Sequence, residues 1–280
     1  MASIEYSLFR AKFIKPSQMS LLNQELTPRG MFLQALEDRP SGELRAGYIW
    51  HVGNIQYFSE GTGYFAVGRT TNSTIEKFDD LSGNFIEEEL EESPYTHCVF
   101  NADIGFIGIA RKASLAPTPK GVAERIGQLL SSTRVIVENN ISVEIAPIPD
   151  PEGFLHALDT AYRVMRFAAT FRGPNPFDAD EHFQKPLSVY LCAANGEKGK
   201  ALIQGDDLNR EVLKEVTRST AATGNEASAK IIKKNSKKAI NINLKGDPIK
   251  LGYNEDEHNP EVVLADLTRL YHRVRSDGRD

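Results

Sequence analysis

The sequence predicts an α+β fold: an antiparallel, sheet-rich N-terminal part with packed helices, followed by a more helical C-terminal part that contains a basic β-hairpin. Aromatic and β-branched residues alternate with polar ones through most of the first 111 positions, which is typical of strands. Punctuated helical patterns begin near residues 118, 150, 206 and 259. The run Gly-Pro-Asn-Pro at 173–176 is the strongest break in the chain.

Strands dominate the first predicted part. Residues 4–13 alternate between apolar and polar side chains, and the runs 47–58 and 63–71 flank a short turn, as in a hairpin. Residues 95–111 predict two further strands around an Asn-Ala-Asp turn. A weakly helical stretch at 17–38 separates the first strand from the second.

Helices and strands alternate in the segment that follows. Thr118 is placed to cap a helix that has proline at its first position, and Asp150-Pro151 begins another helix by the same logic. Strands are predicted at 141–147 and 166–172.

The rest of the chain predicts helices at 178–194, from Asp206-Asp207 onward, and from Asn259 to near the C-terminus. A hairpin of two strands lies between the last two helices. Its apolar side is formed by Ala227, Ala229 and Ile231 on one strand and by Ile240, Ile242 and Leu244 on the other. We therefore expect an α/β globular domain at 1–172 and a helical region with the basic hairpin at 173–280, although the length also fits one domain.

The charges of the chain are unevenly distributed around a net value of −5. Between Glu76 and Glu92 there are eight acidic residues and one lysine, whereas between Ser228 and Lys250 there are seven lysines and one aspartate. Such asymmetry indicates a polyanion-binding end, or attraction between two parts of the molecule or two copies of it. Two cysteines, an N-terminus unlike a signal peptide and the lack of a long apolar run predict a cytoplasmic protein.

Signatures of catalysis and metal binding are not found in the sequence. Residues 196–201 resemble the end of a phosphate-binding loop, but Ala194 and Ala201 replace the required glycine and hydroxyl residue, so we predict a Gly/Lys turn. The six histidines lack the spacing of zinc ligands. We therefore predict no catalytic residue, no metal and no cofactor. A defence nuclease or effector with an unrecognised site is the alternative.

The basic hairpin is the strongest candidate site in the sequence. Lysines on a two-stranded ribbon follow a phosphate backbone, and binding is then strongly salt-dependent. The predicted contacts with duplex DNA are lysines in and beside the hairpin and cations on the preceding helix: Lys230, Lys233, Lys234, Lys237, Lys238, Lys245, Arg210, Lys214 and Arg218. The hairpin lacks aromatic residues for base stacking and arginines for base readout, so we expect little sequence preference.

The lysine cluster also fits two roles that do not involve DNA. Lysines protect exposed strand edges against aggregation, without binding anything. Alternatively, the chain is an interaction module, in which the acidic segment 76–92 of one copy docks on the basic hairpin of another.

Residues 103–130, DIGFIGIARKASLAPTPKGVAERIGQLL, resemble a stretch of the lambda RexA-type phage-exclusion proteins, in which an Ile-Gly-Phe-Ala-Arg strand leads into a similar helix. The order of elements is similar over most of the chain, the local likeness covers 108–130, and Arg111 is the motif position. The resemblance implies a non-enzymatic, homodimeric DNA-binding protein of a prophage or bacterial defence locus. Such proteins are thought to sense phage DNA–protein complexes and to activate a separate membrane effector, which aborts the infection. The sequence departs from the family in its net negative charge and its acidic segment 76–92.

Overall fold

The computed structural model describes residues 3–14, 26–172, 183–196, 198–234, 236, 238–255 and 258–276. The described strands are β1 (Ser3–Ile14), β2 (Ser41–Arg45), β3 (Tyr48–Tyr57), β4 (Thr62–Asp79), β5 (Asn84–Glu92), β6 (Tyr95–Asn101), β7 (Phe106–Ala110), β8 (Ser142–Pro147), β9 (Ala161–Arg172), β10 (Lys198–Gln204), β11 (Ala227–Lys233), β12 (Ala239–Asn243) and β13 (Lys250–Asn254). The described helices are α1 (Pro28–Glu37), α2 (Pro119–Ser131), α3 (Arg134–Glu138), α4 (Glu152–Thr160), α5 (Gln184–Ala193), α6 (Arg210–Ala222) and α7 (Pro260–Arg275).

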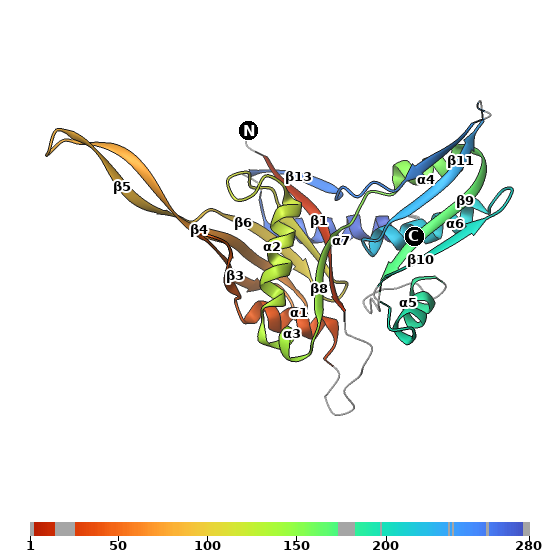
Figure 1. The fold of residues 1–280 in the computed structure, drawn as a ribbon, viewed down its shortest axis with the longest axis horizontal. Helices are drawn as coiled ribbons and strands as arrows, with labels where there is room; N and C mark the ends of the chain where they lie inside the picture. The colour runs from red at the N-terminus through yellow and green to blue at the C-terminus, as the bar shows by residue number, and fades with distance from the viewer. Residues whose placement is uncertain are drawn as a thin grey trace.

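The strands form two antiparallel sheets, and the predicted α+β class is confirmed (Figure 1). The first sheet has nine strands in the order β13-β1-β7-β6-β4-β3-β2, with β5 paired to β4 and β8 paired to β1. The second sheet has four strands in the order β10-β9-β11-β12. Both sheets cross the predicted division at residue 172, because β13 joins the first sheet and β9 belongs to the second.

The first sheet is covered on both faces. One face packs against α1, α2 and α3 through residues such as Phe9, Phe65 and Leu129. The other face packs against α7, where Gly108 of β7 allows a close approach: a β-carbon at this position would overlap the side chain of Leu267. The second core cluster continues from α7 into the second sheet, so the two sheets share one hydrophobic interior.

The predicted caps of α2 and α7 are confirmed. The Thr118 hydroxyl accepts a hydrogen bond from the Gly121 N–H at 3.2 Å, and the Asn259 side chain accepts one from the Glu261 N–H at 2.9 Å. The predicted start of α6 at Asp206-Asp207 is wrong, because Asn209 caps that helix. Asp207 instead accepts a hydrogen bond from the Val164 N–H at 3.0 Å and so ties the turn before α6 to β9.

Four other segments differ from the sequence-based expectation. The predicted Gly/Lys turn at 196–201 is largely strand β10. Strand β9 begins at Ala161, earlier than the predicted 166. The helix predicted at 17–38 is seen only as α1, and the helix predicted at 178–194 only as α5; residues 17–25 and 178–182 lie outside the described residues.

The acidic segment forms a ribbon that projects from the body of the molecule (Figure 1). Residues Thr71–Asp79 of β4 pair with β5, beyond the point where β4 leaves the first sheet. We call this ribbon, residues 71–92, the arm. In the described part of the chain, no helix has both the length and the apolar character needed to cross a membrane.

Candidate nucleic-acid interface

The predicted basic hairpin is present as β11 and β12. Lys230 pairs with Asn241, and Ile231 pairs with Ile240. The hairpin is not a free ribbon, however, because β11 also pairs with β9, which pairs with β10. The surface available to a ligand is therefore the face of a four-stranded sheet, and its composition depends on all four strands.

One face of this sheet belongs to the core. Ala229 of β11 lies opposite Phe167 of β9, and Ala227 lies opposite Ala169, and all four side chains are buried. The ring of Phe167 packs edge-on against that of Phe154 in α4, with centroids 6.4 Å apart. Helices α4 and α6 therefore cover this face.

The opposite face carries the positive charge. Opposed residues of antiparallel strands share one face, and the pairing of the four strands brings six cations onto it: Arg163, Arg166, Arg172, Lys198, Lys200 and Lys230. We call this surface the basic face. In the described strands, none of the residues on it is acidic, and its other members are polar or small, such as Asn241, Ser228 and Ala168, except for Leu202 and Ile232. The face is therefore positively charged overall.

Four of the six cations of the basic face oppose one another in two pairs. Lys230 lies directly opposite Arg166, and Lys198 lies directly opposite Arg172. Like charges in this position destabilise a sheet. The second pair is neutralised, because Lys198 makes an ion pair with Glu226 at 3.6 Å and Arg172 makes one with Glu144 at 2.7 Å. Within the described residues, Lys230 and Arg166 make no such pair.

Two further cations of the face are similarly available. Lys200 and Arg163 are exposed, and neither makes an ion pair with a described carboxylate. The guanidinium of Arg163 lies 5.3 Å from the centroid of the Tyr162 ring, a cation–π contact that leaves its charge uncompensated. Three of the uncompensated cations, Arg163, Arg166 and Lys230, thus lie toward the tip of the hairpin, whereas Lys200 lies opposite Thr170, beside the compensated pair.

The tip carries three of the predicted lysines. Lys233, Lys234 and Lys238 are exposed there, and the Ser236 N–H closes the turn by donating to the Lys233 carbonyl at 3.0 Å. Lys237 lies outside the described residues. Lys233 is three residues from Lys230 along β11 and pairs with the buried Ala161, so its side chain points to the other side of the sheet, whereas Lys234 and Lys238 lie beyond the paired strands at the end of the basic face.

The three predicted cations of α6 do not extend this surface. Arg210 donates to the carbonyls of Ala161 and Tyr162 at 3.3 and 3.0 Å. Lys214 pairs with Asp159 of α4 at 3.1 Å, and Arg218 pairs with Glu152 at 3.2 Å. These contacts hold α6 against β9 and α4 on the covered side of the sheet.

Lys245 also lies away from the basic face. It lines a hollow of about 730 Å³ on the α4 side, together with Asp150, Phe154 and Asp247. Of the nine predicted residues, the structure therefore places Lys230 on the basic face and three lysines at the adjoining tip of the hairpin. It adds Arg163, Arg166 and Lys200, which the sequence reasoning missed.

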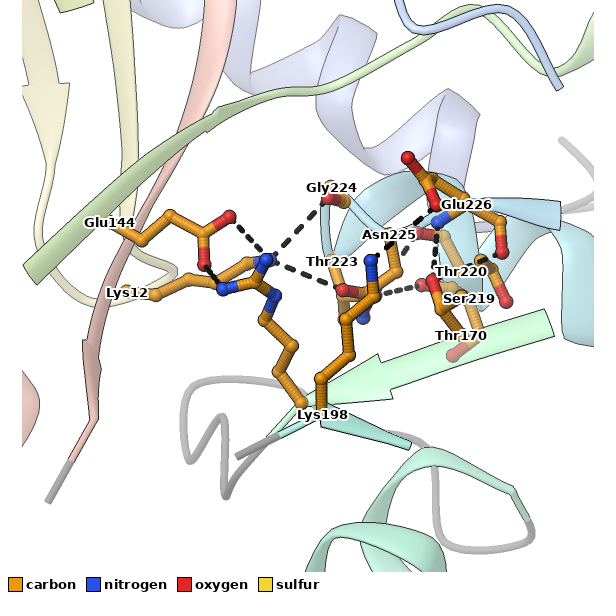
Figure 2. Close-up of polar contacts among 11 residues, drawn as sticks. Lys12, Glu144, Thr170, Lys198, Ser219, Thr220, Thr223, Gly224, Asn225 and Glu226 are labelled. Carbon is orange, nitrogen blue, oxygen red and sulfur yellow. Dashed lines mark hydrogen bonds and ion pairs between the residues drawn. The ribbon is translucent and has the colours of Figure 1, made fainter. Parts of the chain in front are cut away.

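A buried polar cluster fixes the second sheet against the first (Figure 2). The Lys12 ammonium of β1 donates to the Gly224 carbonyl at 3.4 Å and to Asn225 Oδ1 at 3.3 Å. Burial lowers the pKa of Lys12 to about 8, although Glu144 at 4.0 Å acts in the opposite direction. Because Glu144 also binds Arg172, the cluster connects the first sheet to β9 at the edge of the basic face.

Arg111, the motif position of the resemblance, lies on the first sheet. Its N–H donates to the Glu5 carbonyl at 2.8 Å, and its exposed side chain lines a hollow of about 530 Å³ beside His97. His97 hydrogen bonds to Tyr64 at 2.8 Å, and His258 hydrogen bonds to Tyr6 at 2.6 Å. Arg111 therefore lies outside the basic face.

The side chains of the described residues include no group of three or more that could hold a metal ion. Burial raises the pKa of the Cys98 thiol well above its usual value, which opposes formation of a nucleophilic thiolate. The fold and surface define an α+β protein with two antiparallel sheets, one of which presents a basic face. Comparison with protein-family models and with curated proteins found no match.

Proposed function

We propose that the basic face binds the phosphate backbone of duplex DNA with little sequence preference. The observation that carries the proposal is the opposition of Lys230 and Arg166 without a described carboxylate to neutralise them. An anion placed above such a pair removes their mutual repulsion and gains two charge-assisted contacts. Side chains that share a face repeat about every 7 Å along a strand, which supplies a row of cations for successive phosphates.

The composition of the face supports contact with the backbone over base readout. Apart from Tyr162, whose exposed ring contacts Arg163, the described strands bring no aromatic side chain to this face on which a base could stack. The four uncompensated cations, together with Lys234 and Lys238 of the tip, supply about six phosphate contacts, which corresponds to a salt slope of about −5 on a double-logarithmic plot.

The biological role we propose is that of a sensor in phage exclusion. The resemblance of residues 103–130 supports this role, in which the bound DNA–protein complex of a phage is the trigger and a separate membrane effector responds. Expression of the protein with its neighbouring genes in a bacterial host should lower the plating efficiency of a susceptible phage. Equal plating with and without the protein across a broad phage panel would contradict the role.

Fluorescence anisotropy with a labelled duplex, measured over a series of salt concentrations, tests the DNA contact. The double variant Arg166→Gln/Lys230→Gln should bind at least about tenfold more weakly and show a salt slope smaller by about 2. Lys120→Gln is the matched control, because Lys120 is exposed at the start of α2 on the other sheet. Equal affinity of the double variant and the control variant would show that the basic face does not bind DNA.

A further inference from the structure

The arm has two chemically different faces. Opposed residues share a face, so Glu76 lies beside Glu87 and Phe78 lies beside Phe85. Glu89 and Glu91 of β5 lie on the same side, two and four positions along the strand from Glu87. We call this side the acidic face of the arm. The reverse side carries Ile75, Ile86 and Leu90 around the ion pair of Lys77 with Glu88.

The acidic face of the arm is uncovered and electrostatically strained. The rings of Phe78 and Phe85 contact each other with centroids 5.3 Å apart, yet Phe85 is 83% exposed and Leu81 at the tip is 98% exposed. An isolated two-stranded ribbon is only marginally stable in water. Glu76 directly opposite Glu87 lowers the stability further. The arm therefore gains stability from a cationic partner.

The basic face has an unfavourable pair of like charges of the opposite sign. Its Lys230–Arg166 pair is opposed in the same way as Glu76–Glu87, with the opposite sign. It also offers apolar surface to the phenylalanines of the arm, because Leu202 is 41% exposed and lies opposite Ala168 on this face. Contact between the two faces would neutralise both strained pairs at once.

One molecule cannot make this contact with itself. Figure 1 shows the arm and the second sheet at opposite ends of the longest axis, with the first sheet between them. Two copies placed side by side and antiparallel bring each arm to the second sheet of the other. The two contacts are then identical and close a two-fold dimer.

We propose that the acidic face of the arm docks on the basic face of a second copy and thereby competes with DNA for that surface. The competition rests on the proposed function of the basic face, whereas the docking itself does not. The carboxylates of the arm occupy the positions of phosphates, and free DNA-binding surface appears only when the dimer opens.

A charge-swap experiment tests the docking. Sedimentation velocity of the full chain should show a dimer at low salt that dissociates as salt rises. The arm variant Glu87→Lys/Glu89→Lys and the face variant Arg166→Glu/Lys230→Glu should each be monomeric alone. An equimolar mixture should dimerise, because the reversed arm meets the reversed face and the two unchanged surfaces also match. A misfolded variant would not be rescued in this way.

Two further measurements distinguish the possible outcomes of this experiment. Glu124→Lys, an exposed position in α2, is the matched control and should dimerise like the original chain. A chain that is monomeric at all salt concentrations overturns the proposal. The proposal is also overturned if the charge-reversal variants still dimerise while the variant Ile75→Ser/Leu90→Ser is monomeric, because the arms then associate through their apolar sides.

DNA binding distinguishes failure of this inference from failure of the proposed function. The arm variant should bind duplex DNA more tightly than the original chain, by about fivefold at a total protein concentration ten times the dimer dissociation constant, because about one fifth of the original chains are then monomeric. If the mixed charge-swap variants dimerise but neither the original chain nor any variant binds DNA, the docking is supported and the proposed function is contradicted. If the arm variant binds DNA no more tightly than the original dimer, the competition is overturned.

Discussion

Lys230 lies directly opposite Arg166 where β11 pairs with β9, and a register shift follows immediately between Lys230 and Ile231. Two cations at opposed positions on an exposed face cost stability. The neighbouring Lys198–Arg172 pair shows how the fold compensates such an arrangement, because Glu226 and Glu144 each neutralise one member. The uncompensated pair therefore marks the part of the sheet best suited to an external anion.

Removing one cation from the uncompensated pair should stabilise the free protein. We expect Lys230→Thr to raise the free energy of unfolding by about 0.5 kcal/mol in urea denaturation, because the repulsion with Arg166 is lost. Lys198→Thr is the control with the same change of side chain, and it should give no such gain since the pairing with Glu226 is lost too. Equal effects of the two substitutions would show that strand propensity, and not charge, sets the result.

Acid should destabilise the fold through two histidines that face each other. The rings of His97 and His258 have centroids 5.1 Å apart, and burial is the main cause that lowers the pKa of each below 6.5. The unfolded chain therefore takes up protons first, and stability should fall as the pH drops from 6.5 through the lowered pKa values. Urea unfolding at pH 7.5, 6.5 and 5.5 measures this loss.

The double variant His97→Gln/His258→Gln provides the control for this pH dependence. Its unfolding free energy should vary less between pH 7.5 and pH 5.5 than that of the original chain. An unchanged pH dependence would assign the acid sensitivity to other groups.

Lys12 should produce a pH dependence in the alkaline range. Burial lowers the pKa of Lys12 from 10.5 to about 8, so between these values the unfolded chain holds a proton that the folded chain has released. Stability from this residue therefore rises with pH over the same window. The unfolding free energy of Lys12→Met minus that of the original chain should fall between pH 8 and pH 10.5, as measured by guanidinium denaturation. A constant difference would mean that Lys12 keeps an ordinary pKa.

The close packing of α7 on the first sheet is tested at Gly108. A β-carbon there would overlap the Leu267 side chain, so Gly108→Ala should cost about 2 kcal/mol of unfolding free energy through overpacking. Adding Leu267→Ala should make the two effects non-additive, because the second change creates the space that the first requires. Additive effects in thermal unfolding would place the strain of Gly108→Ala elsewhere, for example at Val99.

The class of the fold and most of the helices could be predicted because their signals are local. Thr118 and Asn259 lie next to prolines and are followed by apolar stripes, and both cap the helices predicted for them. The start of α6 could not be predicted, because Asp207 has the same capping chemistry as Asn209, yet its side chain binds the Val164 N–H of a distant strand. The local sequence does not show that a distant strand offers Asp207 a hydrogen-bond donor.

The basic face could be predicted only in part, because it depends on register between distant strands. Alternation identifies the hairpin and therefore Lys230. Arg166 and Lys200 join that residue only through the pairing of β9 with β10 and β11, over long sequence separations. The prediction that α6 extends this surface is wrong because only the helical spacing could be read from the sequence. That spacing places Arg210, Lys214 and Arg218 on one side of the helix, but this side packs on neighbouring elements.

Strand β4 belongs to both the arm and the body of the molecule. It runs unbroken from Thr62 to Asp79, with one half pairing to β6 in the body and the other to β5 in the arm. Arg69 holds the junction, because its guanidinium stacks 4.7 Å from the Tyr48 ring and donates to the Ser114 carbonyl at 3.2 Å. Because β4 is shared, the arm is joined to the body through the residues of β4 that pair with β6, among them Ala66, which lies opposite His97.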